Sequence, residues 1–405
     1  MRIVIATGVY YPMTNGVATF SHNLATGLAR KGHEVLVLCP SFEGKKHIVQ
    51  EGNLTVQYIS AHRMALYPDQ IHKVPKKQLF YKKGAWVSFR PYHEIKAILR
   101  KFKPDVIHVQ TPELIGFSAI YYAKRRKIPL VITGHNYPDT VTGQFKMLKF
   151  AKKPLDAIVT RFFIDFQKHG DYTTMPTELA IRNLILDRHQ KYNAPIEAIS
   201  NGIDLKAFRP GKPSVELYKK YRVPSNKPAV IYVGRVDPEK NIAMVLKAFA
   251  NVVQKVPESI LIVVGDGTDL ANLKKLAQKL KIAPQVYFLG RVLLPELAEV
   301  YKMGKVFATG SEMETQGIVL IEAAATGLPL VAVDKGGVAD ICQNNFNGFL
   351  GEAGNTNEMA QNIIKLLTDA KLYKKFAQNS LKVAQKHDLE ATLTRFIEIY
   401  QKLMK

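Results

Sequence analysis

The sequence predicts an α/β protein with two doubly wound, Rossmann-like domains. Short apolar runs alternate along the chain with segments whose apolar residues recur at helical spacing, which indicates repeated strand–helix units. These runs are continuous instead of alternating with polar residues, as in parallel strands that are covered on both faces. A length of 405 residues leaves room for two or three domains, and 47% hydrophobic with 22% charged residues is an ordinary globular composition.

The first domain is predicted over residues 1–195. Its first strand runs into a loop that contains Gly, Pro and Asn, and Gly32 closes the helix that follows. The predicted elements are strands at 3–6, 34–38, 105–109 and 129–133, with helices at 19–31 and 114–126.

The second domain is predicted over residues 196–387 and begins a new series of the same kind. Its first strand is followed by a loop at 234–241 that carries two basic residues. The C-terminal segment 388–405 has helical apolar spacing, and it either completes this domain or packs elsewhere. The other predicted elements are strands at 229–233, 259–264, 286–289, 305–308 and 329–333, with helices at 242–256, 270–280 and 317–326.

Cysteine usage and hydropathy exclude several classes of protein. Cys39 and Cys342 show no Cys-x-x-Cys or His-pair spacing, which argues against a structural zinc site and a disulfide framework. Uncharged apolar stretches such as 114–123 are too short to span a bilayer. The start of the chain breaks at Thr7 and Gly8 before a signal-peptide core can form, so we expect a cytoplasmic protein.

The net charge of +23 is unusual for this composition, because 57 Lys and Arg residues stand against 34 Asp and Glu. It is uneven: residues 1–200 hold 29 basic and 14 acidic residues, whereas residues 201–405 hold 28 and 20. Such an excess favours an anionic partner, which leaves nucleic acid, an acidic membrane surface and phosphorylated substrates open.

The segment 311–329 carries the sharpest chemical pattern. It reads as a loop that enters a helix near Gly317, where free N–H groups and the positive end of the helix dipole suit a phosphate or sugar hydroxyls. Glu322 lies on an otherwise apolar helix, which is costly unless it hydrogen-bonds a group such as a ribose diol. The alternative is a surface loop followed by a helix with one solvated Glu.

Four further residues carry candidate chemistry. Arg235 and Lys240 lie five residues apart between a strand and a helix, where two cations can hold a diphosphate; the alternative is a solvated basic loop with Glu239 as partner. His135 follows a buried strand and is either a site residue or a satisfied loop residue. Gly16 either lets the backbone approach phosphates or is a plain turn glycine.

Taken together, these motifs resemble glycosyltransferase family 4, whose members are retaining, nucleotide-sugar-dependent enzymes of the GT-B fold. That fold has two Rossmann-like domains facing a cleft. The resemblance extends from residue 2 to about 400. It rests on the Glu-x7-Glu pair Glu314 and Glu322 with its flanks, Gly16, Gly32-His33-Glu34-Val35, Asp105-Val106-Ile107-His108, Thr133-Gly134-His135, Ser200-Asn201-Gly202-Ile203-Asp204, Val233-Gly234-Arg235, Lys240-Asn241, Gly265-Asp266-Gly267 and Gly336-Gly337.

The resemblance implies a role for each matching residue. Arg235 and Lys240 grip the donor diphosphate, Glu314 lies near the sugar hydroxyls and Glu322 binds the ribose. His135 lies beside the transferred sugar, although the family usually has an aromatic residue where this chain has Gly134. The implied catalytic residues are His135, Arg235, Lys240 and Glu314, and the implied donor-binding residues are Gly16, Arg235, Lys240, Glu314, Thr315, Gln316, Gly317, Ile318 and Glu322.

The resemblance also bears on cofactors, substrates and architecture. We expect no cofactor and no metal, because no Asp-x-Asp pair stands at a comparable strand end and Arg and Lys can replace a divalent cation. UDP-glucose is the implied donor. Segment 388–405 matches the region that crosses back to the first domain. The stretches 311–317 and 172–178 look like those of bacterial diacylglycerol glycosyltransferases, which favours a lipid acceptor over a soluble sugar.

Residues 63–103 combine eleven Lys and Arg residues with Trp86 and other aromatics. This mixture suits an anionic membrane interface, so we expect peripheral association with the inner face of the cell membrane. The alternatives are a solvated charged face above an aromatic core and a nucleic-acid-binding face, and no recognised nucleic-acid-binding motif supports the latter. The expected membrane-binding residues are Lys76, Lys77, Lys82, Lys83 and Trp86.

Overall fold

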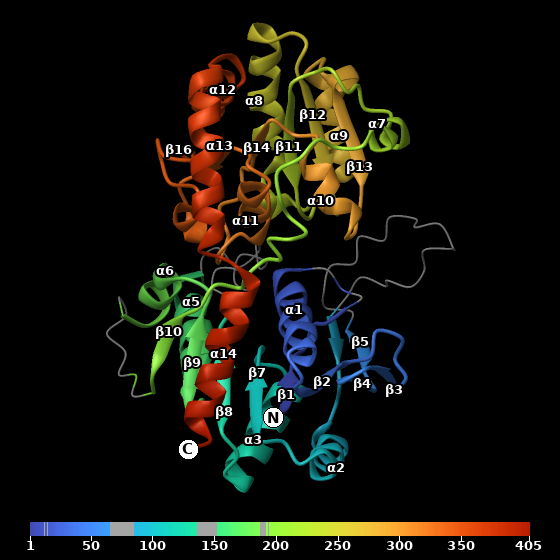
Figure 1. Ribbon diagram of the computed structural model, residues 1–405, viewed down its shortest axis with the longest axis vertical. Coiled ribbons are helices and arrows are strands. Elements are labelled where there is room, and N and C mark those ends of the chain that lie inside the picture. Colours follow the sequence, from blue (N-terminus) through green and yellow to red (C-terminus); the bar gives the residue numbers. More distant parts are fainter. Residues whose placement is uncertain (12, 14, 65–84, 136–151, 187–191, 193) are drawn as a thin grey trace. The chain divides into compact units, whose positions relative to one another are not determined.

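The computed structural model describes the whole chain except residues 12, 14, 65–84, 136–151, 187–191 and 193. The chain divides into two compact units (Figure 1). The first unit comprises Met1–Asn201 and Glu390–Lys405, and the second comprises Gly202–Leu389. The sequence predicts this boundary at 195/196, six residues earlier than the structure has it. Helices and strands alternate in both units, and each unit has a mostly parallel sheet of the predicted α/β class.

The first unit contains an eight-stranded sheet in the order β10-β9-β8-β7-β1-β2-β4-β3. Neighbouring strands run parallel except β3, which pairs antiparallel with β4 at the edge. The chain passes from β1 outward on one side and later returns to β7 on the other, so the strand order reverses between β1 and β7. The strands are β1 Arg2–Ala6, β2 Glu34–Pro40, β3 His47–Glu51, β4 Leu54–Ile59, β7 Val106–Val109, β8 Leu130–Thr133, β9 Tyr172–Met175 and β10 Ile196–Ala198, with a separate β5 His62–Met64 and β6 Ala85–Val87.

Helices cover both faces of this sheet (Figure 1). Asn15 caps the first helix, since its Oδ1 accepts a hydrogen bond of 2.8 Å from the Ala18 N–H. Apolar residues of α2 and α3 pack with β1, β2, β7 and β8 in one buried cluster. The helices are α1 Gly16–Arg30, α2 Tyr92–Phe102, α3 Leu114–Arg126, α5 Lys152–Gln167, α6 Glu178–Ile181 and α14 Leu389–Leu403, with a π-helical turn at Arg182–Leu186.

The C-terminal helix α14 packs within the first unit, beside α1 (Figure 1). The absence of a side chain at Gly27 permits this approach, because a Cβ there would lie 2.4 Å from Leu393 Cδ1. The Tyr400 hydroxyl lies 2.7 Å from Nδ1 of the buried His108, whose Nε2 lies 2.7 Å from Thr133 Oγ1. The helix is therefore bound to the centre of this sheet by packing and by a buried polar chain.

The second unit contains a six-stranded parallel sheet in the order β13-β12-β11-β14-β15-β16. Here the order reverses between β11 and β14. Two buried apolar clusters lie on the two faces of the sheet. The elements are β11 Ala229–Val233, β12 Ile260–Val264, β13 Val286–Gly290, β14 Val306–Ala308, β15 Leu330–Val333 and β16 Gly348–Gly351, with α7 Val215–Tyr221, α8 Ile242–Lys255, α9 Leu270–Lys279, α10 Glu296–Tyr301, α11 Ile318–Ala325, α12 Thr356–Thr368 and α13 Ala370–Gln385.

Candidate functional site

The carboxyl ends of β11 and β14 form the point of strand-order reversal in the second unit, where open α/β sheets bind ligands. Glycines let the loops at this edge approach one another closely. A Cβ at Gly267 would lie 2.1 Å from the Val236 carbonyl oxygen, and one at Gly310 would lie 2.5 Å from the Asn241 carbonyl oxygen. Larger residues at these two positions would force the loops apart.

Arg235 lies two residues after the end of β11, and its side chain is about half exposed. It forms ion pairs of 2.5 Å with Asp237 and 2.7 Å with Glu239. Asp237 in turn accepts hydrogen bonds of 2.8 and 2.9 Å from the backbone N–H and hydroxyl of Thr268. The loop after β12 therefore fixes Asp237, which orients the guanidinium. Sequence reasoning named Glu239 as a partner and missed Asp237, although it stands only two residues after Arg235.

Lys240 ends a short 3-10 turn, Pro238–Lys240, before α8 begins. Its Nζ lies 2.6 Å from Glu314 Oε1, and each of the two side chains is only 16% exposed. Lys240 comes from the loop after β11 and Glu314 from the loop after β14, so the ion pair joins the two sides of the strand-order reversal. A second anion entering here would meet a lysine that is already oriented and desolvated.

The loop 311–317 enters α11 through Gly317, which has φ 78°. A Cβ at this glycine would be strained and would also lie 2.4 Å from Leu320 Cδ1. Gly337 donates its N–H to the Glu314 carbonyl oxygen at 2.7 Å, and this hydrogen bond stabilises the loop. Gln316 and Gly317 are buried, Thr315 and Ile318 are partly buried, and Glu312 is exposed. The structure thus brings Arg235, Lys240, Glu314 and the start of α11 to one edge of the sheet.

Glu322 lies in the middle of α11 and is 8% exposed. It accepts a hydrogen bond of 2.6 Å from the hydroxyl of the buried Tyr301, at the end of α10. Burial raises the pKa of this carboxyl from its usual value of 4.5 to about 7, and the Tyr301 hydrogen bond opposes part of that increase. Sequence reasoning predicted the cost of burying Glu322 but missed Tyr301, because the two residues lie 21 positions apart on different helices.

In the first unit, His135 follows β8 and is buried. Its Nε2 lies 2.8 Å from Gln110 Oε1, and its ring packs against Phe20 of α1 with centroids 5.0 Å apart. Since the amide oxygen can only accept, Nε2 carries the proton. Burial lowers the pKa of His135 to about 3, so the imidazole is neutral at pH 7. His135 can therefore contribute a hydrogen bond near a sugar but carries no positive charge.

Two glycines of the first unit have clear structural settings. A Cβ at Gly134 would lie 2.2 Å from Gln167 Nε2, so Gln167 occupies the space beside this glycine. This explains how the chain packs where the resemblance leads one to expect an aromatic residue. Gly16 is the first residue of α1 and lies at its N-terminus, three residues earlier than the predicted start of that helix.

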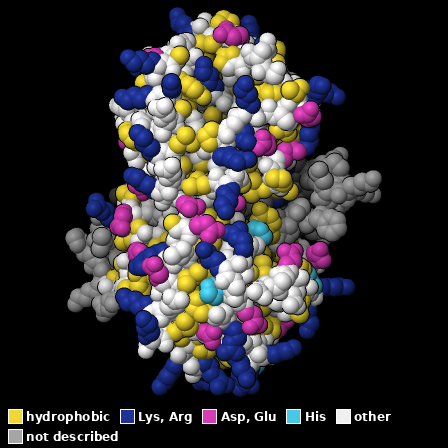
Figure 2. Space-filling view, in the orientation of Figure 1, with side chains coloured by type: hydrophobic (Ala, Val, Ile, Leu, Met, Phe, Trp, Pro, Cys, Tyr) yellow, Lys and Arg dark blue, Asp and Glu magenta, His cyan; other side chains and the backbone are white. Residues whose placement is uncertain are grey.

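Lys76, Lys77, Lys82 and Lys83 lie outside the described residues, and Trp86 on β6 is half-buried. The described part of the first unit has another basic and apolar surface. Lys and Arg side chains gather at the end of this unit near α2 and α3 (Figure 2). Phe117 of α3 and Phe162 of α5 are neighbours, with ring centroids 6.0 Å apart. We define the outer surface of α3 and α5 by its exposed apolar residues, Leu114, Tyr121, Ile158 and Phe162.

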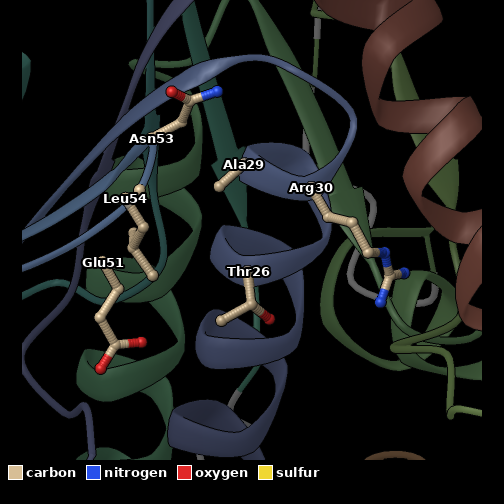
Figure 3. A pocket seen from close by; sticks show the side chains of 7 residues that line it. Thr26, Ala29, Arg30, Glu51, Asn53 and Leu54 are labelled. Atoms are coloured by element: carbon tan, nitrogen blue, oxygen red, sulfur yellow. The ribbon is translucent and has the colours of Figure 1, made fainter.

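A hollow of about 310 Å³ lies between α1 and the β3–β4 hairpin (Figure 3). Thr26, Ala29 and Leu54 line it, together with Glu51 and Arg30. Arg30 also forms an ion pair with Glu390 of α14. None of the predicted site residues lines this hollow.

The described residues contain neither a cluster of metal-ligating side chains nor a membrane-spanning helix. No group of three or more His, Cys, Asp and Glu side chains in this part of the chain could hold a metal ion. Among the helices that the structure describes, none is both long and apolar enough to cross a bilayer.

Comparisons with known proteins match both units. Residues 14–207 match the family model of Glycosyltransferase Family 4, and residues 215–383 match that of Glycosyl transferases group 1. The chain is 30% identical to an alpha-monoglucosyldiacylglycerol synthase of Streptococcus pneumoniae, over 82% of this chain and 71% of that protein. It is 28% identical to a GDP-mannose-dependent alpha-mannosyltransferase of Mycobacterium tuberculosis, over 87% of this chain and 84% of that protein. The crystal structure of Anabaena HepE in complex with UDP-glucose has a TM-score of 0.74 at 18% identity, and the match covers 99% of this chain and 100% of that one.

Proposed function

This chain belongs to glycosyltransferase family 4 and has the GT-B fold, and we propose that it transfers a hexose from a nucleotide sugar to a membrane lipid. Glucose from UDP-glucose is the proposed donor group, and diacylglycerol is the proposed acceptor. The transfer retains the anomeric configuration and needs no metal ion. The likeness to an alpha-monoglucosyldiacylglycerol synthase supports both the sugar and the acceptor.

The cation pair of the second unit is the observation that carries this proposal. Arg235 and Lys240 follow β11, and the start of α11 follows β14, at the strand-order reversal where α/β sheets bind nucleotides. Two cations and a helix N-terminus at one edge can neutralise a diphosphate without a divalent ion. Lys240 already holds one carboxylate oxygen at 2.6 Å, which shows that its ammonium is within reach of an anion at this edge.

The proposed chemistry places the developing negative charge on the leaving diphosphate. The bond between the anomeric carbon and the phosphate oxygen breaks while the acceptor oxygen bonds to the same face of that carbon. The acceptor proton passes to an oxygen of the departing phosphate. Arg235 and Lys240 stabilise that phosphate, and the N–H groups around Thr315–Ile318 add to the effect.

The remaining residues bind and orient the donor. Glu314, held by Lys240, accepts hydrogen bonds from hydroxyls of the transferred sugar. Glu322 binds the ribose. In the first unit, the neutral His135 donates its Nε2 proton to Gln110, so its Nδ1 accepts a hydrogen bond from the sugar, and the N-terminus of α1 at Gly16 receives the phosphates.

A lipid acceptor requires the protein to reach a membrane, and we propose that it binds the cytoplasmic face of the cell membrane peripherally. The charge of the first 200 residues supports this, as does the outer surface of α3 and α5, where exposed apolar side chains lie near basic ones. Arg125 lies 5.1 Å from the Tyr121 ring centroid on this surface. Basic residues with aromatic neighbours are typical of proteins that bind anionic bilayers.

A donor and acceptor panel tests the proposed function. Purified protein is incubated with UDP- and GDP-sugars, with diacylglycerol vesicles or soluble sugars as acceptors, and products are identified by mass spectrometry. A glucosyl lipid formed from UDP-glucose is the expected product. Transfer only to a soluble sugar would overturn the lipid acceptor, and failure with every donor while the protein binds DNA would favour the nucleic-acid alternative.

A further inference from the structure

Tyr301 and Glu322 form a buried polar pair inside the second unit. The Tyr301 hydroxyl lies 2.6 Å from Glu322 Oε2, and Tyr301 has no exposed surface. A carboxylate in an apolar helix is costly unless it is hydrogen-bonded. The tyrosine therefore reduces the cost of keeping Glu322 where it is.

Packing holds the Tyr301 ring in one place. Phe208 meets it edge-on with ring centroids 5.8 Å apart, and the ring centroid of Phe307, in the same buried cluster, lies 6.4 Å away. The hydroxyl also lies 3.3 Å from the Val319 carbonyl oxygen, one turn before Glu322 on α11. It is therefore confined between two acceptors on the same helix.

This arrangement satisfies the carboxyl group in both of its protonation states. When Glu322 is ionised, the Tyr301 O–H donates to Oε2. When Glu322 is protonated on Oε2, that proton is donated to the tyrosine oxygen, and the Tyr301 O–H is donated to the Val319 carbonyl. In either state Oε2 is occupied by the tyrosine. The Tyr301 hydrogen bond is to Oε2, and none of the hydrogen bonds of the described residues is to Glu322 Oε1, which leaves that oxygen for a ligand.

The titratable surroundings of Glu322 are simple. Burial and the Tyr301 hydrogen bond are the two influences on its pKa, and no charged side chain of the neighbouring α13 or β15 adds to them. Tyr232 of β11 is the other titratable group that acts on Tyr301. A change in the ionisation of Glu322 can thus be traced to Tyr301 or to a bound ligand.

We propose that Tyr301 is a positioning residue for nucleotide binding, because it holds Glu322 Oε2 and thereby directs Oε1 to the ribose hydroxyls. This inference rests on the proposed function, in which Glu322 binds the ribose of the donor. It adds a residue that never touches the nucleotide yet determines how well the ribose is held.

Calorimetric titration with UDP and 2′,3′-dideoxy-UDP tests this role in the full-length protein and its Tyr301→Phe variant. We expect the variant to bind UDP about tenfold more weakly, the effect of one hydrogen bond to a charged group. Its affinity for the dideoxy nucleotide should change by less than about twofold, because that ligand has no ribose hydroxyls to lose. Equal losses for both nucleotides would overturn the proposal, since a merely structural tyrosine would weaken both alike.

A pH series supplies a second readout that does not require the variant to fold. In the wild-type protein, the preference for UDP over dideoxy-UDP should decrease as the pH falls through about 7, the pKa of Glu322, and a constant preference would overturn the proposal. Both ligands carry the same phosphates, so phosphate titration cancels in the ratio. In Tyr301→Phe the midpoint should move to higher pH, because the hydrogen bond that favours the ionised carboxylate is gone.

Tyr400→Phe is the matched control, since Tyr400 is also buried with one hydrogen-bonded hydroxyl but lies in the first unit. It should leave the affinities for UDP and dideoxy-UDP unchanged. A tenfold loss of UDP affinity in Tyr400→Phe would mean that the effect of Tyr301→Phe reflects general destabilisation. Failure of the wild-type protein to bind either UDP or GDP would instead contradict the proposed function itself.

Discussion

At the scale of single residues, the second-unit site combines charges that already have partners. Arg235 is held by Asp237 and Glu239, and Lys240 is held by Glu314. In the proposed function, a donor diphosphate would compete with these carboxylates for Arg235 and for Lys240. This arrangement fixes the cations before the donor arrives, which reduces the reorganisation needed when charge develops on the leaving group.

Replacing either cation should reduce turnover strongly. We expect Arg235→Ala and Lys240→Ala each to lower kcat by at least about 100-fold, the scale of losing one donor to a developing anion. Steady-state kinetics with a lipid acceptor measures this. Lys247→Ala, an exposed lysine on α8 of the same unit, is the control and should be near wild type. Near-normal rates in a folded double variant would remove both cations from the mechanism.

Glu322 should destabilise the folded protein at neutral and alkaline pH. Its pKa is about 7 in the fold against a usual 4.5, so the folded state resists ionisation that the unfolded chain accepts. The resulting cost begins near pH 4.5, is complete above pH 7 and amounts to about 3 kcal/mol. Glu322→Gln should therefore gain about that much unfolding free energy relative to wild type between pH 4.5 and 8, measured by urea unfolding. Parallel pH curves for the two proteins would contradict the raised pKa.

At the scale of secondary-structure elements, many continuous apolar runs were predicted as strands, whereas the parallel strands β4 and β9 and the edge strand β3 were not. Strands β1, β2, β11 and β12 are continuous apolar runs, and each was predicted within about two residues. The β3 strand was missed because it is an edge strand whose Ile48 and Val49 are exposed, so burial leaves no pattern in its sequence. The helix α2 was hidden within a segment interpreted as a basic membrane-binding stretch.

The residues of the candidate site were also predicted only in part. Residues that a motif carries, such as Lys240 and Glu314, were predicted, and the structure joins them at 2.6 Å. Asp237 and Tyr301 were missed because their importance depends on which loops and helices become neighbours. Local spacing along the chain contains no such information for residues on different elements.

The buried hydrogen bonds that connect Tyr400 of α14 to His108 and Thr133 lead to a prediction at this scale. Tyr400→Phe removes the hydroxyl that bonds His108 Nδ1 and leaves that buried nitrogen without its partner on α14. The expected loss is about 1–3 kcal/mol of unfolding free energy, measured by urea unfolding. Tyr121→Phe, an exposed tyrosine of the same unit, should change stability little. Equal stability of Tyr400→Phe and wild type would show that the buried chain contributes nothing to the attachment of α14.

At the scale of the whole molecule, the excess positive charge and the outer surface of α3 and α5 together predict attachment to anionic bilayers. Ile158→Glu should weaken vesicle flotation several-fold, because it places a negative charge on a surface that meets anionic lipid. Binding should also weaken as added salt shortens the Debye length below about 8 Å.

Ile48→Glu is the matched control, since Ile48 is 62% exposed and Ile158 is 66% exposed, but Ile48 lies on β3. It should leave flotation unchanged. Equal binding to neutral and anionic vesicles would contradict an electrostatic attachment. Equal effects of the two substitutions would show that α3 and α5 are not the contacting surface.

The central claim is that this protein carries out retaining hexosyl transfer from a nucleotide sugar through cationic side chains. The most direct test is to determine the anomeric configuration of the product by NMR, after incubation with UDP-α-glucose and diacylglycerol vesicles in the presence of EDTA. An α-glucosyl lipid, formed at the same rate with and without EDTA, is the predicted result. A β-linked product, or activity that EDTA abolishes and Mg²⁺ restores, would contradict it.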